Sequence, residues 1–206
     1  AEARRLYDGG DYEEAIKKWP WSFADQRRAL KAIIDGAGNK RRAYNVVDKN
    51  LKKLLISAFQ SELFNRVLAE RMEKCGIDTI LTGDMAYKHE NGAMFAVEDA
   101  ASEQPRCANW EISPTGPLIG SAMRKLTGQA GEIENPILES AGLDERDMKQ
   151  LDNFARGGRR VLRFWPVDWD VMSGRDDAGE YVEFAFTLDA GSYATTLLRE
   201  VCKKEF

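Results

Sequence analysis

The chain has 206 residues, with 30 Lys and Arg against 34 Asp and Glu, and therefore a formal net charge of −4. Hydrophobic residues make up 43% and aromatic residues 10%, an ordinary globular composition that excludes bulk disorder. The longest apolar stretch, residues 54–59, is far shorter than the roughly 20 residues that cross a bilayer, so we expect no membrane span.

The first third of the chain predicts short helices. Asp11 is placed to cap a helix that ends at Pro20, because an aspartate side chain accepts hydrogen bonds from the free N–H groups of the first turn and proline stops a helix. Ser22, with Asp25 three residues later, predicts a capping box for a second helix, which Gly36 ends.

The longest predicted helix starts at Asp48 and runs to Cys75, with Gly76 at its C-terminal cap. Its apolar residues recur every three or four positions between Leu51 and Met72, which is the spacing of one helix face. We therefore expect this helix to anchor the core of its domain.

After this helix the pattern changes to strands. Residues 85–90 and 93–97 flank Asn91 and Gly92, the dipeptide most typical of a hairpin turn, and so predict two antiparallel strands. Residues 112–120 contain two prolines and two glycines, and we expect a shaped loop there.

The rest of the chain predicts two short helices and then two strands, over residues 135–141, 144–154, 160–165 and 181–188. The last strand alternates apolar and polar residues, as a strand with one buried face does. A turn at residues 189–191 leads to a closing helix that Ser192 or Tyr193 opens. Together these elements predict an α+β fold, helix-rich with a small mixed sheet in the N-terminal part and followed by C-terminal strands and a helix, with a boundary near residues 152–158.

Single residues exclude several kinds of chemistry. Three cysteines without C-x-x-C spacing fit a reducing, cytoplasmic environment better than a disulfide framework or a zinc site. His89 is the only histidine, so a multi-histidine metal site is impossible, and its place beside a hairpin turn predicts a surface residue. Asp84, next to Gly83, is a lone carboxylate in a turn, and we expect it to be structural.

Two basic clusters are the candidates for binding nucleic acid: Lys40, Arg41 and Arg42, and Arg156, Arg159 and Arg160. Neutralising phosphates requires Lys and Arg gathered on one surface, not a positive net charge. Contacts of this kind would read the RNA backbone and shape more than its sequence. The alternative is that both clusters are solvated loops or helix ends.

Five stretches, taken in order, resemble the TruD family of tRNA pseudouridine synthases: residues 57–65, 83–84, 113–120, 158–162 and 186–200. The resemblance extends from about residue 50 to the C-terminus. It implies an enzyme that isomerises a uridine of tRNA to pseudouridine, by family assignment uridine 13, with tRNA as its partner and without a metal or an organic cofactor. It also implies that residues 1–152 are mainly the TruD insertion domain and residues 153–206 the C-terminal segment of the synthase catalytic domain.

Within the last stretch, Tyr193, Thr195 and Thr196 are expected to form one wall of the active site. Glycine at position 191 permits a tight turn into the closing helix. Tyr193 can then stack on a flipped base, and the backbone N–H groups of the helix start can meet a phosphate. A packed core aromatic is the equally weighted alternative for Tyr193.

One departure from the family is decisive for the chemistry. Its members carry the catalytic aspartate in a Gly-x-Lys-Asp motif near the N-terminus, followed by an Asn-Tyr-Phe-Gly-type motif, and neither occurs in this sequence. The reaction needs a carboxylate beside a uridine taken out of its stack. The chain also begins at Ala1 without an initiator Met, so we expect a fragment with no catalytic residue of its own, the family aspartate lying upstream of Ala1. A missing N-terminal half or a second chain would complete the catalytic domain.

Two other functions remain open. The chain can be a catalytically silent RNA-binding module that kept the fold. It can also be a helical protein-interaction domain, because residues 6–16 are similar to the second half of a tetratricopeptide repeat, although no second copy matches about 34 residues further on.

Overall fold

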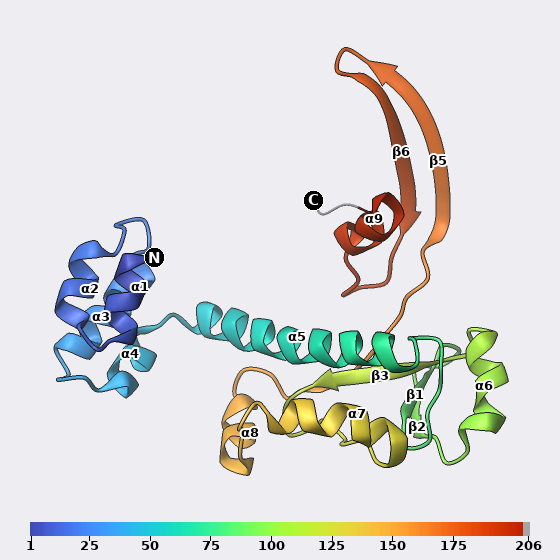
Figure 1. Ribbon diagram of the computed structural model, residues 1–206, viewed down its shortest axis with the longest axis horizontal. Coiled ribbons are helices and arrows are strands. Elements are labelled where there is room, and N and C mark those ends of the chain that lie inside the picture. The colour runs from blue at the N-terminus through green and yellow to red at the C-terminus, as the bar shows by residue number, and fades with distance from the viewer. Residues whose placement is uncertain (204–206) are drawn as a thin grey trace. The chain divides into compact units, whose positions relative to one another are not determined.

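The computed structural model describes residues 1–203 and is of the α+β class, as predicted (Figure 1). Its helices are α1 Glu2–Asp8, α2 Tyr12–Lys18, α3 Ala24–Ile34, α4 Lys40–Val46, α5 Lys49–Lys74, α6 Ala100–Ala108, α7 Gly128–Glu139, α8 Glu145–Leu151 and α9 Ala194–Cys202. Its strands are β1 Met85–Lys88, β2 Met94–Ala96, β3 Ile112–Leu118, β4 Gly158–Val161, β5 Val167–Asp176 and β6 Gly179–Thr187. Within residues 1–203 no helix combines the length and apolarity of a membrane span.

The chain forms two compact units. The first comprises Ala1–Glu62, Ile119–Ala122 and Leu143–Gly157, and the second comprises Leu63–Leu118, Met123–Gly142 and the described residues from Gly158 onward. Helix α5 contributes residues to both units, so each unit is described by itself.

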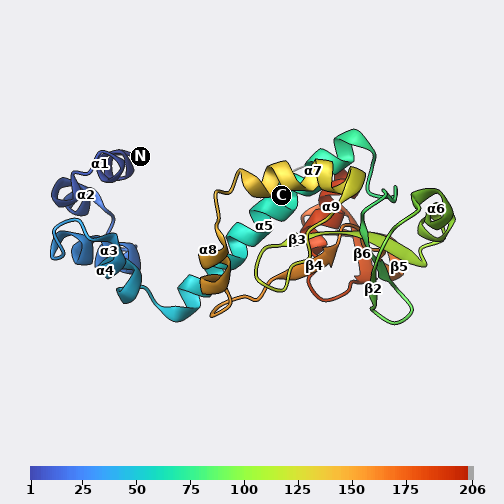
Figure 2. The ribbon, with the colours of Figure 1, turned by 90° about the horizontal axis from the view of Figure 1, so that it is seen from below.

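The first unit is built from short helices, with α1 packed on α2 and α3 on α4 (Figure 2). The Asp11 cap is confirmed, because its carboxylate accepts a hydrogen bond from the Glu14 N–H group (3.2 Å). The predicted Ser22–Asp25 capping box is wrong. A turn in which the Phe23 N–H group donates to the Pro20 carbonyl (3.1 Å) leaves Ser22 before the cap, and Phe23 begins α3 without a side-chain hydrogen bond.

The long predicted helix is confirmed as α5. The Asp48 carboxylate accepts hydrogen bonds from the N–H groups of Asn50 (2.8 Å) and Leu51 (3.3 Å), and these bonds lower the pKa of Asp48. At the other end Gly76 has a φ of 87°, a left-handed conformation that glycine adopts without steric cost.

A four-stranded antiparallel sheet in the order β2-β1-β3-β4 organises the second unit. The predicted hairpin is confirmed as β1 and β2, in which Met85 is opposite Ala96. Ala86 of β1 and Ile112 of β3 belong to a buried apolar cluster of the sheet. Gly116 of β3 lets the sheet meet α5 closely, because an added Cβ would lie 2.7 Å from atoms of Phe64 and Leu162.

The predicted loop over residues 112–120 is wrong, because most of it forms the interior strand β3. Two prolines are tolerated because β1 pairs only with the first half of β3 and β4 only with its second half. The carbonyl of Pro114 accepts a hydrogen bond from the Leu162 N–H group (3.0 Å). The Thr115 hydroxyl adds a side-chain hydrogen bond to the Met85 carbonyl (2.6 Å).

A second sheet is the two-stranded ribbon of β5 and β6, with Val171 opposite Phe184. The sequence predicted β6 but not β5, and it also did not predict α4 or α6. The closing helix is confirmed as α9, with Tyr193 at its N-cap. Several large apolar side chains of the ribbon are exposed, among them Trp169, Met172 and Val182.

Asp84 proves to be structural, as predicted, and its role is to pair with a buried arginine. Arg71 of α5 donates to both carboxylate oxygens (2.7 and 2.5 Å), and the Leu81 N–H group donates to one of them (2.8 Å). Both charged side chains are almost completely buried. The pair therefore ties α5 to the turn that begins β1.

We expect Asp84→Asn to lower the free energy of unfolding by about 3–5 kcal/mol, because the substitution leaves the Arg71 guanidinium buried without its counter-charge. Urea unfolding of the chain measures this. Glu70→Gln is the matched control, since it removes the partner of Lys74 from a pair whose side chains are 52% and 40% exposed, and it should cost less than about 1 kcal/mol. Equal losses in the two variants would contradict the role given to Asp84.

Candidate functional site

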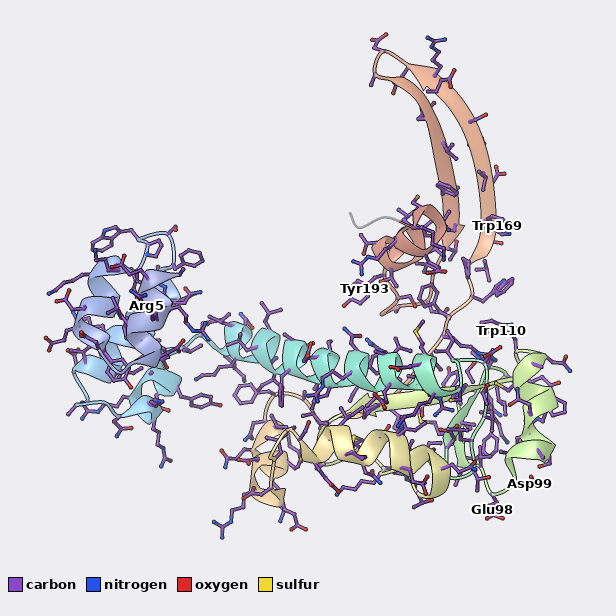
Figure 3. All side chains as sticks on the ribbon, in the orientation of Figure 1. Arg5, Glu98, Asp99, Trp110, Trp169 and Tyr193 are labelled. Carbon is purple, nitrogen blue, oxygen red and sulfur yellow. The ribbon has the colours of Figure 1, made fainter. Side chains whose placement is uncertain are left out.

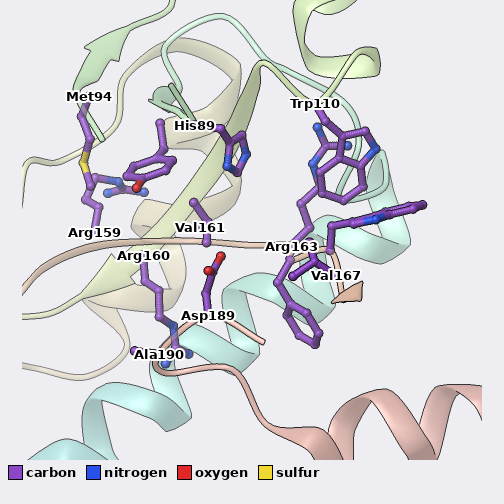
Figure 4. Close-up of a pocket in the computed structure, with 13 residues that line it drawn as sticks. His89, Met94, Trp110, Arg159, Arg160, Val161, Arg163, Val167, Asp189 and Ala190 are labelled. Atoms are coloured by element: carbon purple, nitrogen blue, oxygen red, sulfur yellow. The ribbon is translucent and has the colours of Figure 1, made fainter. Parts of the chain in front are cut away.

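A cavity of about 850 Å³ opens in the second unit beside β1 and β4 (Figure 4). Its lining comes from the β1–β2 hairpin, the turn after α6, strand β4 with the residues that follow it, and the loop before α9. Most of the lining side chains are aromatic, aliphatic or basic, and among residues 1–203 Asp189 is the only acidic one. The cavity therefore favours a flat, negatively charged ligand.

A polar network centred on the buried Ser113 hydroxyl holds one side of the cavity. Arg163 Nε donates to Ser113 Oγ (2.9 Å), and His89 Nε2 lies 2.8 Å from the same oxygen. Arg163 Nη2 also donates to the carbonyl oxygens of Cys107 (2.5 Å) and Ile112 (3.0 Å). Arg163 is thus a buried cation held by neutral acceptors.

His89 is a surface residue, as predicted, but its environment changes its titration. Partial burial of the ring lowers the pKa of His89, the positive charge of Arg163 lowers it further, and Asp189 opposes both effects. With a pKa below the ordinary histidine value, the ring is neutral at physiological pH. It presents an uncharged aromatic surface to the cavity.

Arg159, predicted to contact RNA, requires a correction. Its side chain is 2% exposed and pairs with Glu134 of α7, which is equally buried (2.6 Å between Nη2 and Oε2). Its guanidinium also donates to the Thr115 hydroxyl and carbonyl and to the Arg124 carbonyl (2.8 Å each). Burial raises the pKa of Glu134, and the hydrogen bonds and charge of Arg159 oppose the rise. Arg159 has no donor left to offer a phosphate.

Arg160, the next residue of β4, points to the other face of the strand, as successive strand residues do. Its guanidinium lies 4.0 Å from the centroid of the Phe64 ring and lines the cavity. Among residues 1–203 no carboxylate forms an ion pair with it. Arg156 belongs to the first unit, where its side chain is exposed and its carbonyl accepts a hydrogen bond from the Ala122 N–H group (2.9 Å). Arg156 and Arg160 thus remain available to a ligand.

The other predicted basic cluster is the first turn of α4, in the first unit. Lys40, Arg41 and Arg42 are exposed. Arg42 Nη1 donates to the Asp35 carbonyl (3.0 Å), which folds this side chain back onto the end of α3. Lys40 and Arg41 are the freer cations of this cluster.

The predicted wall residues lie at the start of α9. Tyr193 is labelled in Figure 3. Its side chain is 63% exposed, and Thr195 and Thr196 are exposed too. The Tyr193 carbonyl accepts hydrogen bonds from the N–H groups of Thr196 (3.0 Å) and Leu197 (3.3 Å). None of the three predicted residues lines the cavity, whereas Asp189 and Ala190, just before them, do.

No group of three or more His, Cys, Asp or Glu side chains within residues 1–203 is arranged to hold a metal ion. Cys107 is buried, and burial raises the pKa of its thiol. It therefore packs as a small apolar side chain against the sheet.

Comparison with known proteins gives a family match over almost the whole chain. The family model described as tRNA pseudouridine synthase D (TruD) matches residues 1–201. The chain belongs to the TruD family. The membership confirms the resemblance found in the sequence and extends it to the first 50 residues, whose sequence was less distinctive.

Curated relatives named tRNA pseudouridine synthase D share more than a third of their residues with the chain. Those of Geotalea daltonii and Geobacter sulfurreducens are 38% and 39% identical over 203 residues, which are 98% of this chain and 49% and 48% of the relatives. The relative of Thermus thermophilus is 38% identical over 198 residues and is covered to 52%. The chain spans about half the length of the curated relatives that it matches.

A crystal structure described as tRNA pseudouridine synthase D (TruD) from Methanosarcina mazei has the same fold, with a TM-score of 0.78 and 24% sequence identity. The match covers 99% of this chain and 50% of that chain. At this identity the likeness establishes the fold alone.

Sequence reasoning named His89, Arg159 and Arg160 but not the other side chains that build the cavity. Trp110, Arg163, Trp165 and Asp189 come from separate turns and strand ends, and no motif joins them. The sequence did contain one indication, because Arg159 and Arg163 lie on the same side of an extended segment and Arg160 on the other. Which side is buried depends on the packing of α6 and α7.

We expect the single histidine to titrate below the ordinary pKa of histidine, and Asp189→Asn to lower its pKa further by removing the charge that favours the imidazolium. Nuclear magnetic resonance of the ring Cε1–H group gives both values without overlap, because there is no second histidine. The pKa of His89 is lower in the folded chain than in the unfolded chain. The contribution of His89 to stability is therefore complete above its unfolded-state pKa and is lost as the pH falls through its folded-state pKa. If the pKa of His89 is the same in the Asp189→Asn variant, the Asp189 carboxylate does not act on the His89 ring.

Proposed function

We propose that the chain is part of an enzyme that isomerises a uridine of tRNA to pseudouridine. The observation that carries this proposal is the family match over residues 1–201, together with relatives named tRNA pseudouridine synthase D that are 36–39% identical. We further infer that the site of reaction is uridine 13, that the protein is cytoplasmic, and that no metal or organic cofactor takes part.

In the proposed reaction the N1–C1′ bond breaks and a C5–C1′ bond forms on the same base, C5 loses its proton and N1 gains one, so no atom is gained or lost overall. The base must leave its stack, detach, turn and reattach within one enclosed site. This requires a carboxylate in direct contact with the nucleoside. We propose that the Gly-x-Lys-Asp motif, which these 206 residues lack, lies in an N-terminal half of the same protein or in a second chain.

We assign residues 1–152 mainly to the TruD insertion domain and residues 153–206 to the end of the catalytic domain. On this assignment Tyr193, Thr195 and Thr196 form one wall of the active site. The exposure of Tyr193 supports this role against the alternative of a packed core aromatic, because an aromatic ring in the core would be covered.

For the RNA backbone we propose separate contacts by Arg156 of the first unit, by Arg160 of the second unit, and by Lys40, Arg41 and Arg42 of the first unit. Their support is that they are cations without a carboxylate partner among the described ion pairs. Arg159 is not included, because its guanidinium is committed to Glu134.

The chain alone should bind an unmodified tRNA transcript without forming pseudouridine, because the catalytic carboxylate is absent. A longer polypeptide that includes the Gly-x-Lys-Asp segment should form pseudouridine at uridine 13. Mapping by chemical adduct formation and primer extension measures both. Pseudouridine formed by the chain alone would refute the missing-aspartate proposal, and an inactive longer polypeptide that still binds tRNA would favour the silent RNA-binding module.

Arg156→Gln combined with Arg160→Gln should weaken tRNA binding and make its salt dependence shallower, by about 0.7 to 0.9 in the slope of log K against log salt for each phosphate that the variant no longer neutralises. Filter binding over a series of salt concentrations measures the slope. Lys17→Gln combined with Lys74→Gln is the control, because both lysines are already paired with Glu14 and Glu70. A slope equal to that of the unsubstituted chain would remove the two arginines from the interface.

A further inference from the structure

Four aromatic rings form a continuous series in the cavity. Tyr87 and His89 have ring centroids 5.4 Å apart, His89 and Trp110 6.4 Å, and Trp110 and Trp165 5.2 Å. All four residues line the cavity. A series of rings at one opening offers flat apolar surface in several orientations.

Trp110 is held in an unusual conformation. Its φ is 61°, in the left-handed region that bulky residues avoid, at the turn where α6 ends and its N–H group donates to the Cys107 carbonyl (3.1 Å). Glycine would satisfy this turn without strain. Arg163 stacks on the ring, with its guanidinium carbon 3.9 Å from the centroid. A strained backbone that keeps a large ring at a cavity indicates that the ring has a use there.

Trp165 is the open member of the series. It is 62% exposed, and its one described ring contact, with Trp110, is tilted by 66°. The two rings therefore do not stack in parallel, and a face of Trp165 is free to receive another flat group.

Two cations that lack an anionic partner within the described residues line the cavity: Arg163 lies on the Trp110 ring, and Arg160 lies on the Phe64 ring at the other side of β4. Arg160 and Arg163 form no ion pair among residues 1–203, and the hydrogen bonds of Arg163 in this part of the chain use Nε and Nη2 but not Nη1. Because Arg159 is neutralised by Glu134, the lining within residues 1–203 keeps these two positive charges against the single negative charge of Asp189. The cavity therefore attracts an anion at the same place where it offers aromatic faces.

We propose that this cavity binds an unpaired nucleotide of RNA, with the base stacked on the Trp165 ring and a phosphate group facing Nη1 of Arg163, while Arg160 adds a second positive charge to the lining. The inference rests on the proposed function only in assuming that the chain binds RNA. A base exposes its faces only when it is unstacked, so the cavity prefers single strands, loops and bulges over a duplex. A protein segment is less well matched to the surplus of positive charge.

The test is the affinity of the chain for a fluorescently labelled single-stranded oligouridylate, measured by anisotropy for two tryptophan variants. Trp165→Ala should weaken binding by about fivefold to 150-fold, because base stacking on an aromatic side chain contributes about 1–3 kcal/mol per base. Trp169→Ala is the matched control; Trp169 lies in β5 (Figure 3). Its side chain is 66% exposed and does not line the cavity, so the substitution should leave the affinity unchanged. Both tryptophans are exposed, so neither variant removes core packing.

The outcomes separate the proposals. An equal loss in both variants, or the same Trp165→Ala loss with an oligouridylate–oligoadenylate duplex, would overturn base stacking in the cavity. An unchanged affinity in Trp165→Ala, with tRNA binding intact, would overturn the cavity proposal and leave the proposed function standing. If the chain binds neither oligouridylate nor tRNA, both proposals fail.

If Trp165→Ala keeps its RNA affinity but loses association with the proposed N-terminal half, a protein segment occupies the cavity and the nucleotide proposal is overturned.

Discussion

Two buried arginines, one in β4 and one just after it, hold the second unit together. Arg159 joins β3 to α7 through Glu134, and Arg163 joins β3 to the end of α6 through Ser113 and the Cys107 carbonyl. A buried charge is costly unless hydrogen bonds replace its water, and here each guanidinium donates to several acceptors of the protein. The central strand β3 contains two prolines, which have no N–H group to donate. The two arginine side chains supply hydrogen bonds to this strand that its own backbone cannot make.

The different surroundings of these arginines determine what the surface can bind. The charge of Arg159 is neutralised by its carboxylate partner. Arg163 is surrounded by neutral groups and the face of Trp110, so its charge is not neutralised. Arg160, between them on the opposite side of β4, stacks on Phe64 and keeps its charge as well. Three neighbouring basic residues therefore have separate roles: one structural, one that combines structure with binding, and one available for binding.

Local patterns predicted the elements whose causes are local. The α5 helix follows from its apolar periodicity and the Asp48 cap, and the first hairpin follows from Asn91 and Gly92. Strand β3 was not predictable, because the tolerance for its prolines depends on neighbouring strands that each cover half of it. The family was predictable from ordered motifs, whereas the cavity was not, because its rings come together only when β1, β4 and the turn after α6 are in place.

The ribbon of β5 and β6 is the part of the second unit to which we propose that a further polypeptide adds. A two-stranded ribbon is marginally stable by itself, and this one exposes apolar side chains such as Trp169 and Val182 along strands with free edges. Such edges pair readily with further strands, and the relatives are about twice as long as this chain. If the proposed N-terminal half adds strands to this ribbon, the same contact that covers its apolar residues brings the missing carboxylate to the Tyr193 end of α9. Folding and catalysis would then depend on one interface.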